Sequence, residues 1–241
     1  MPPYFSIIIP TFNRARLISR AVKSVLAQTF EEWEMIIIDD GSSDNTGKVL
    51  EQFISDSRIH CHYTSKIGPA AARNLGASFA SGRYLTFLDS DDEYFPDHLA
   101  IRAGILSAQP ALEMLHGGVE VIGDTMIADK NDSTKLIPIA DCIVGGTFFI
   151  RRDIFIKLGG FSDIPYSDDN DFFERANDHG AFIRKVDSPT YRYYRTESDS
   201  LCAIVAREGI TGIEKFRNAK RNKRQKAIGG KEHNLKSCVN I

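Results

Sequence analysis

Three carboxylates within four residues, Asp89, Asp91 and Asp92, follow an apolar run over residues 84–88. The run is typical of a buried strand, so the acidic side chains should lie at the carboxyl end of that strand. Hard divalent cations such as Mg²⁺ and Mn²⁺ prefer oxygen ligands, and Mg²⁺ commonly combines one or two carboxylates with substrate phosphates. The cluster therefore predicts a site for a metal ion and a phosphorylated substrate.

A helix cap is the alternative explanation for this cluster, because Asp and Ser favour the N-cap position and residues 96–109 have a helical pattern. A second acidic strand end favours the ligand site, since the apolar run 35–38 is followed by Asp39 and Asp40. In an open α/β sheet, ligands bind at the carboxyl ends of the strands, near a topological switch point. Both acidic clusters should therefore lie where a ligand binds.

A third acidic cluster, formed by Asp168, Asp169 and Asp171, opens a helical pattern. Acidic side chains at a helix N-terminus are favourable through capping and the helix dipole, which is one explanation for the cluster. Three aspartates exceed what a cap uses, however, and a carboxylate placed there could act as a general base on an acceptor hydroxyl. The residues alone leave both explanations open.

The elements that would position these clusters alternate between strand and helix over the first 110 residues, which predicts βαβα order and a parallel sheet. The expected strands are 5–9, 35–38, 59–63 and 84–88, and the expected helices are 15–28, 46–54, 69–80 and 96–109. From residue 112 to 152, short apolar runs are broken by glycine and proline. This second pattern suits mixed or antiparallel strands that shape a second half-site.

The chain has 241 residues, of which 42% are apolar and 26% charged, enough for one sizeable core and a tail. No run approaches the about 18 apolar residues of a membrane helix, and the first residues lead into a strand without a signal peptide. A cytoplasmic protein is therefore expected. The widely spaced cysteines predict reduced thiols rather than a zinc site or disulfides; they are Cys61, Cys142, Cys202 and Cys238.

The net charge of −2 hides a basic segment at residues 214–236, which carries nine Lys or Arg against two Glu. A solvated helix or a frayed terminus would explain it. The alternative is a basic amphipathic segment that lies on anionic lipid, giving peripheral membrane contact. A nucleic-acid partner is not expected, because the segment has one aromatic residue and no reading motif.

Six segments taken together resemble the family 2 glycosyltransferases of GT-A fold. They are 6–14 (SIIIPTFNR), 38–42 (IDDGS), 68–74 (GPAAARN), 89–92 (DSDD), 159–161 (GGF) and 168–169 (DD). Their order and spacing are similar to that family over roughly two thirds of the chain, and such an ordered set is more specific than any single motif.

The resemblance implies an α/β chain with the GT-A fold, a Rossmann-like three-layer α/β/α arrangement. Its central, mostly parallel sheet would be continuous with a smaller mixed sheet. Residues 1–205 would form a single domain, with a nucleotide-sugar-binding half at 1–110 and an acceptor half at 111–205. Residues 206–241 would form a basic C-terminal helix or tail.

The donor implied by the resemblance is a nucleotide sugar, with UDP as the favoured nucleotide. Asp40 would hydrogen-bond the base, while Pro10 and Thr11 line the base site. Arg73 would lie near the nucleotide and the sugar.

The metal implied by the resemblance is Mg²⁺ or Mn²⁺, bound at the Asp-x-Asp element. Asp91 would ligate the metal, Asp89 would take part from the ribose or sugar side, and Ser90 would lie within the donor site. Asp92 would be a neighbour of less defined role.

Asp169 matches the catalytic base of the family, which would take the proton of the acceptor hydroxyl. The metal would offset charge on the departing diphosphate, and in-line attack would invert the anomeric centre. The implied activity is sugar transfer to a glycan, a glycolipid or a lipid-linked acceptor in cell-surface polysaccharide or glycolipid synthesis. Two alternatives are a GT-A-like module that binds nucleotide sugars without transfer, and a sugar nucleotidyltransferase.

The chain departs from the family pattern at three positions. Relatives often end the catalytic half with Tyr-Arg-x-His, whereas Glu197 stands here at the His position, where an anion would repel phosphate. Either Arg195 provides the positive charge or activity is weak. Lys66 stands where Asn is frequent, and Asp168 replaces the common Glu before the base.

Overall fold

The computed structural model describes residues 2–129, 132, 135–164 and 166–196. The predicted basic segment 214–236, the predicted tail 206–241 and Glu197 lie outside these residues. Within the described part of the chain, no helix is long and apolar enough to cross a membrane.

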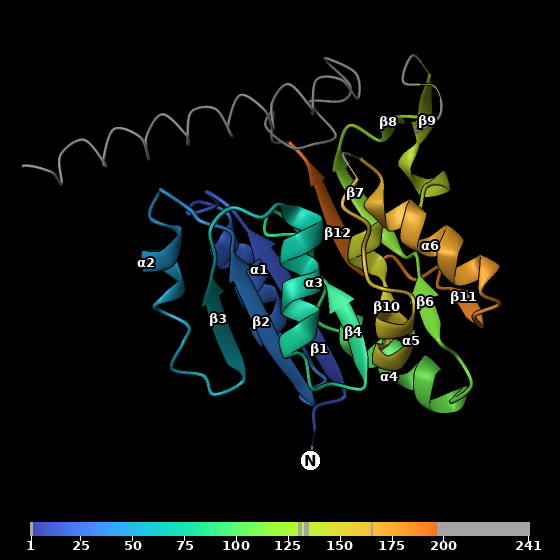
Figure 1. The fold of residues 1–241 in the computed structure, drawn as a ribbon, viewed down its shortest axis with the longest axis horizontal. Helices are drawn as coiled ribbons and strands as arrows, with labels where there is room; N and C mark the ends of the chain where they lie inside the picture. Colours follow the sequence, from blue (N-terminus) through green and yellow to red (C-terminus); the bar gives the residue numbers. More distant parts are fainter. Residues whose placement is uncertain (1, 130–131, 133–134, 165, 197–241) are drawn as a thin grey trace, which may run out of the picture.

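A seven-stranded sheet forms the centre of the molecule, in the order β11-β6-β10-β4-β1-β2-β3 (Figure 1). Every neighbouring pair is parallel except those that include β10, which runs antiparallel to both β4 and β6. The strands are β1 Phe5–Thr11, β2 Trp33–Asp39, β3 Ile59–Tyr63, β4 Tyr84–Phe87, β6 Met114–His116, β10 Phe149–Arg151 and β11 Ile183–Lys185.

Helices cover both faces of this sheet, because β1 and β2 are apolar on both faces. Ile7 and Ile9 pack in one core with α1 and α4, whereas Ile8 packs on the opposite face in a core with α3, α5 and α6. In Figure 1, α3 lies in front of the strands and α1 behind them. The helices are α1 Ile18–Leu26, α2 Thr46–Leu50, α3 Pro69–Phe79, α4 His98–Ala108, α5 Arg152–Lys157 and α6 Asp168–Asp178.

A second sheet joins segments that are far apart in the chain. In it, β12 (Tyr191–Arg195) lies between β5 (Glu93–Tyr94) and β7 (Val119–Gly123), antiparallel to the first and parallel to the second. The strands β8 (Met126–Ala128) and β9 (Leu136–Pro138) pair antiparallel as a separate two-stranded sheet. The three-layer fold with a smaller mixed sheet is therefore confirmed.

The four predicted strands and the four predicted helices are all present, and each of the helices is shorter than predicted. The cap explanation for the acidic cluster after β4 is wrong, because the short strand β5 follows that cluster. Helix α4 begins only at His98, with Asp97 at the N-cap. The carboxylates between β4 and β5 are thus free of a capping role.

Candidate donor and catalytic site

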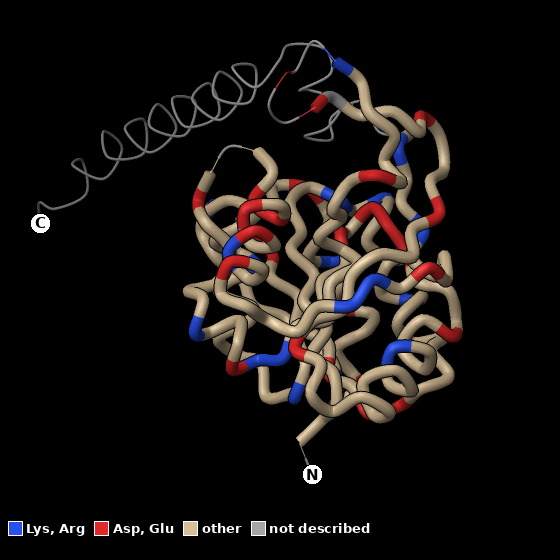
Figure 2. Tube along the Cα trace, turned by 90° about the vertical axis from the view of Figure 1, so that its right-hand side faces the viewer, with Lys and Arg blue, Asp and Glu red and all other residues tan. Residues whose placement is uncertain are grey.

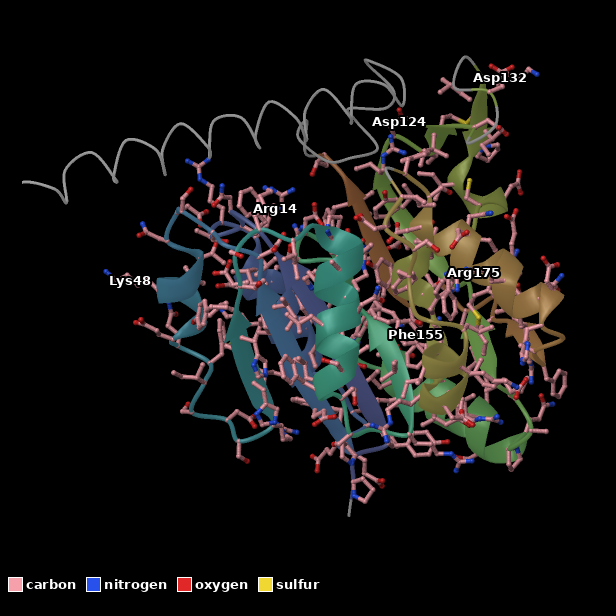
Figure 3. The ribbon with its side chains drawn as sticks, in the orientation of Figure 1. Arg14, Lys48, Asp124, Asp132, Phe155 and Arg175 are labelled. Carbon is pink, nitrogen blue, oxygen red and sulfur yellow. The ribbon has the colours of Figure 1, made fainter. Side chains whose placement is uncertain are left out.

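The loops that follow β1 and β2 are hydrogen-bonded to each other at the carboxyl edge of the sheet. The amide of Asn13 donates to Ser42 Oγ at 2.9 Å, and the amide of Ser43 donates to Asn13 Oδ1 at 2.8 Å. Asn13 itself has a φ of 54°, a left-handed conformation that non-glycine residues seldom adopt and that often marks a functional loop. Figure 3 labels Arg14 at this edge, which is the upper edge of the ribbon.

Asp40, predicted to bind the base, also fixes the start of α3. Its two carboxylate oxygens accept hydrogen bonds from the amides of Ile67 at 2.5 Å and Gly68 at 2.9 Å. Each carboxylate oxygen has a second lone pair, so an N–H of a base can still be accepted. Thr11, on the same edge, has a buried hydroxyl without a hydrogen-bond partner among the described residues. Pro10, the residue before it, is half-buried at the end of β1.

The acidic turn after β4 contains one carboxylate whose role is structural. Asp92 is 1% exposed and accepts hydrogen bonds from the Tyr191 hydroxyl at 2.6 Å and the Tyr194 amide at 2.8 Å. These bonds anchor β12 to the turn, which the sequence did not reveal. Ser90 is buried beside it, whereas Asp89 and Asp91 remain partly exposed.

Two arginines, neither identified from the sequence, surround Asp91. Arg14 Nε lies 3.8 Å from Asp91 Oδ2, and Arg20 donates to the Asp91 backbone oxygen while its guanidinium stacks on the Tyr194 ring. Burial and then the neighbouring Asp89 raise the pKa of Asp91 to about 6, against the opposing effect of the arginines. Asp91 is therefore a carboxylate that a nearby cation would stabilise in its charged form.

The donor set at this turn suits a divalent cation. No group of three or more His, Cys, Asp or Glu side chains among the described residues is placed to hold a metal. Asp89 and Asp91 supply two carboxylates, however, and Mg²⁺ commonly takes one or two together with substrate phosphates. Their mutual repulsion contributes to the raised pKa of Asp91 and would be relieved by a cation.

Arg73 connects this turn to the third acidic cluster. Its Nη2 donates to Asp89 Oδ1 at 2.7 Å, and its Nη1 donates to Asp168 Oδ2 at 3.1 Å. Burial opposes the charged guanidinium, but the two carboxylates outweigh burial and raise the pKa of Arg73 further. One side chain of α3 thus brings together two acidic clusters that lie far apart in the sequence.

Asp169, the predicted base, lies in the first turn of α6. The amide of Gly145 donates to Asp169 Oδ2 at 2.9 Å, and the amide of Asn170 donates to Oδ1 at 2.8 Å. Burial raises the pKa of Asp169 to about 6 and Asp168 adds to this shift, while the two amides and Arg73 oppose it. A carboxylate with a pKa near 6 is well matched to accept a proton at neutral pH.

A glycine pair, identified in the sequence only as a break in the apolar pattern, supports this base. A Cβ on Gly145 would approach Asp169 Cβ to 2.8 Å, and a Cβ on Gly146 would overlap the Tyr191 hydroxyl. Packing against Asp169 and Tyr191 therefore requires glycine at positions 145 and 146. The pair packs between the predicted base and the tyrosine that anchors the acidic turn.

The Gly-Gly-Phe segment that the resemblance singled out is joined to α3. The Asn74 side chain donates to the Phe161 carbonyl at 2.8 Å and accepts from the Phe161 amide at 2.9 Å. Lys66, one of the departures, lies over the Phe12 ring beside the loop after β1. Arg195 donates to the Met126 carbonyl at 3.0 Å, which links β12 of the second sheet to the β8–β9 hairpin.

The site therefore combines carboxylates and guanidinium groups from both halves of the chain. Figure 2 shows both acidic and basic segments at the end of the molecule opposite the N-terminus. Such an arrangement can hold a cation and a phosphate on one side and a proton-accepting carboxylate on the other.

Comparison with known proteins identifies relatives of this region. The family model described as glycosyl transferase family 2 matches residues 6–112. WfgD of Escherichia coli, named a UDP-Glc:alpha-D-GlcNAc-diphosphoundecaprenol beta-1,3-glucosyltransferase, is 40% identical over 129 residues, covering 52% of this chain and 49% of WfgD. TuaG of Bacillus subtilis (strain 168), a putative teichuronic acid biosynthesis glycosyltransferase, is 46% identical over 99 residues, covering 40% of this chain and 39% of TuaG. The chain therefore spans less than half the length of these curated relatives.

Solved structures share the fold at low sequence identity. S. aureus TarS 1–349 in complex with UDP-GlcNAc has a TM-score of 0.67 and 20% identity, covering 83% of this chain and 60% of that one. The mannosyltransferase PcManGT of Pyrobaculum calidifontis, in complex with GDP-Man and Mn²⁺, has a TM-score of 0.64 and 19% identity, covering 80% of this chain and 57% of that one. Residues 6–112 of this chain therefore match glycosyl transferase family 2, and the chain shares the GT-A fold of the solved glycosyltransferase structures.

Proposed function

We propose that this chain is an inverting glycosyltransferase that moves a sugar from a UDP-linked donor to a hydroxyl of a glycan or lipid-linked acceptor. The observation that carries the proposal is the position of Asp169. This carboxylate has a pKa raised to about 6, and the next residue, Asp168, is bridged through Arg73 to Asp89. A proton acceptor and a donor-side acidic turn are thereby held in one site.

In the proposed reaction, Asp169 takes the proton of the acceptor hydroxyl as the oxygen attacks the anomeric carbon. The bond from that carbon to the diphosphate breaks on the opposite face, which inverts the centre. Gly145 orients the base, because its amide donates to one carboxylate oxygen. That hydrogen bond leaves a lone pair of the carboxylate available for the acceptor proton.

On the donor side, we assign Asp40, Pro10 and Thr11 to the base of the nucleotide, and Asp89, Ser90 and Asp91 to the diphosphate region. Asp89 and Asp91 would hold Mg²⁺ or Mn²⁺, which supplies positive charge against the charge on the leaving diphosphate. Arg14 and Arg20 border the same turn, so they add positive charge beside the proposed diphosphate site.

The names of the relatives support a role in cell-surface polysaccharide or glycolipid synthesis. WfgD acts on a diphosphoundecaprenol-linked acceptor by its name, and TarS is seen with UDP-GlcNAc. A lipid-linked acceptor would keep this enzyme at the cytoplasmic face of a membrane. The basic segment 214–236 has the charge needed to contact anionic lipid.

The test is turnover of UDP-sugars by Asp169→Asn compared with wild type, with UDP affinity measured on the same samples. We expect turnover to fall by at least about 100-fold, because the base contributes typically 10²- to 10⁴-fold, while UDP affinity stays within twofold. Asp171→Asn is the matched control, since Asp171 lies in the same helical turn and pairs with Arg175 instead. Full activity of Asp169→Asn would refute the assigned role.

A module that binds nucleotide sugars without transferring them is the second candidate, favoured by Glu197 at the usual His position. Release of UDP from a UDP-sugar, with water as acceptor, distinguishes the two. Detectable release that depends on Asp169 excludes the binding module.

A further inference from the structure

Among the described residues, Arg73 is the one side chain of α3 that contacts both the acidic turn after β4 and the acidic first turn of α6. It donates to Asp89 on the turn after β4 and to Asp168 at the first position of α6. The three side chains are 17%, 33% and 20% exposed respectively, so water screens these pairs only partly.

The two contacts use different nitrogens of one planar guanidinium. Nη2 reaches Asp89 and Nη1 reaches Asp168, so the separation of the two carboxylates is set by the fixed geometry of the group. A lysine carries the same charge but has a single nitrogen on a flexible stem, so it cannot hold both at this spacing.

Asp168 immediately precedes Asp169 in the same helical turn, so holding Asp168 also fixes the start of the helix that carries the base. From outside its own helix, the Asp169 carboxylate accepts a hydrogen bond from the Gly145 amide. Without Arg73, the first turn of α6 would present adjacent carboxylates opposite Asp89, and their repulsion would push the turn away from the donor side.

We propose that Arg73 is a positioning residue that holds the first turn of α6, and with it Asp169, against the donor-side carboxylate Asp89. This inference rests on the proposed function and deepens it. The base and the donor turn come from different halves of the chain, and Arg73 fixes the distance across which the acceptor oxygen must reach the anomeric carbon. Displacement of a catalytic group by about 1 Å can cost about 100-fold in rate.

The first arm of the test measures kcat and the donor KM for UDP-sugar turnover. Asp168→Asn removes one contact of Arg73 and leaves Asp89 in place, so kcat should fall about tenfold while the donor KM stays within twofold. Arg73→Lys should lower kcat at least as much. Asp171→Asn is the control, because it breaks a pair with Arg175 on the same helix without touching Arg73, and its kcat should match wild type.

The second arm needs neither ligand nor activity. Melting temperatures are measured for Arg73→Gln, Asp168→Asn and the double variant. Because the two residues are partners, the double variant should lose less than the sum of the single losses. The same cycle with Asp171→Asn should be additive.

An unchanged kcat in Asp168→Asn, equal kcat losses in Asp168→Asn and Asp171→Asn, or additive melting temperatures for Arg73 and Asp168 would overturn the proposal. Failure of the proposed function has a different signature. In that case the wild-type protein would turn over no UDP-sugar, while the melting-temperature cycle would still decide whether the link between Arg73 and Asp168 exists.

Discussion

The proposed donor-side half and the proposed acceptor-side half of this site are held together in different ways. On the donor side, the loops after β1 and β2 bond to each other mainly through backbone amides and short side chains such as Asn13 and Ser42. On the acceptor side, the base accepts from the Gly145 amide, and its neighbour Asp168 accepts from Arg73, both far away in sequence. Binding and catalysis should therefore be separable by mutation.

Gly146→Ala should have the largest effect on stability and should break the acceptor half first. Its Cβ would overlap the buried Tyr191 hydroxyl, so we expect a loss of about 2–3 kcal/mol in the free energy of unfolding. Urea denaturation measures this loss. Gly104→Ala is the control: it lies in α4 with open space around it and should gain about 0.5–1 kcal/mol. Equal stabilities of the two variants would contradict the packing described.

Tyr191→Phe should have the next largest effect. It removes the hydroxyl that donates to Asp92 and leaves a buried carboxylate short of a partner, so the loss should be about 1–3 kcal/mol. Tyr193→Phe, on the same strand and half-buried, is the comparison and should cost less. A neutral Tyr191→Phe would mean that the acidic turn does not depend on β12.

The pH dependence of kcat, measured with metal and donor saturating, should report Asp169, because a bound cation keeps Asp91, whose pKa is also raised to about 6, ionised. Asp169 accepts a proton only when it is ionised, and its pKa is raised to about 6. The rate should therefore be level above about pH 7 and fall about tenfold per unit well below pH 6. Asp168→Asn should move this acidic limb to lower pH, because Asp168 is one cause of the raised pKa. If the acidic limb of the pH profile does not move in Asp168→Asn, Asp169 is excluded as the group whose titration causes that limb.

Arg14→Gln should have the smallest effect, confined to the donor half. Arg14 faces Asp91, so we expect UDP affinity in the presence of Mn²⁺ to fall about fivefold, or about 1 kcal/mol, with uridine affinity unchanged. Arg16→Gln makes the same change of charge at an exposed neighbour and serves as the control. Equal losses of UDP affinity in both variants would show that the effect comes from net charge alone.

The two halves also differed in how far the sequence could predict them. The strands β1, β2 and β4, and the acidic residues after β2 and β4, follow from local apolar runs, because each of these strands is continuous and buried on both faces. The edge strand β3 is only partly buried. The insertion of β10 between β4 and β6, and of β12 between β5 and β7, depends on pairing partners that short runs of three to five residues do not specify.

The residues of the candidate site could likewise be predicted only in part. Asp91 and Asp169 were identified by motif, whereas the structural role of Asp92 and the support given by Gly145 depend on contacts over long sequence separations. The paired glycines at 145 and 146 were the one local signal available. A pair of glycines predicts a break in the pattern but does not indicate which side chains pack against it.

The most direct test of whether donor binding is separate from catalysis is calorimetric titration of UDP in the presence of Mn²⁺. Three proteins are compared: wild type, Asp91→Asn and Asp169→Asn. The account predicts that the wild type and Asp169→Asn bind UDP with affinities within twofold. Asp91→Asn should bind at least about tenfold more weakly, a difference of about 1.4 kcal/mol. Equal binding by all three proteins, or loss of binding in Asp169→Asn, would contradict the separation of donor binding from catalysis.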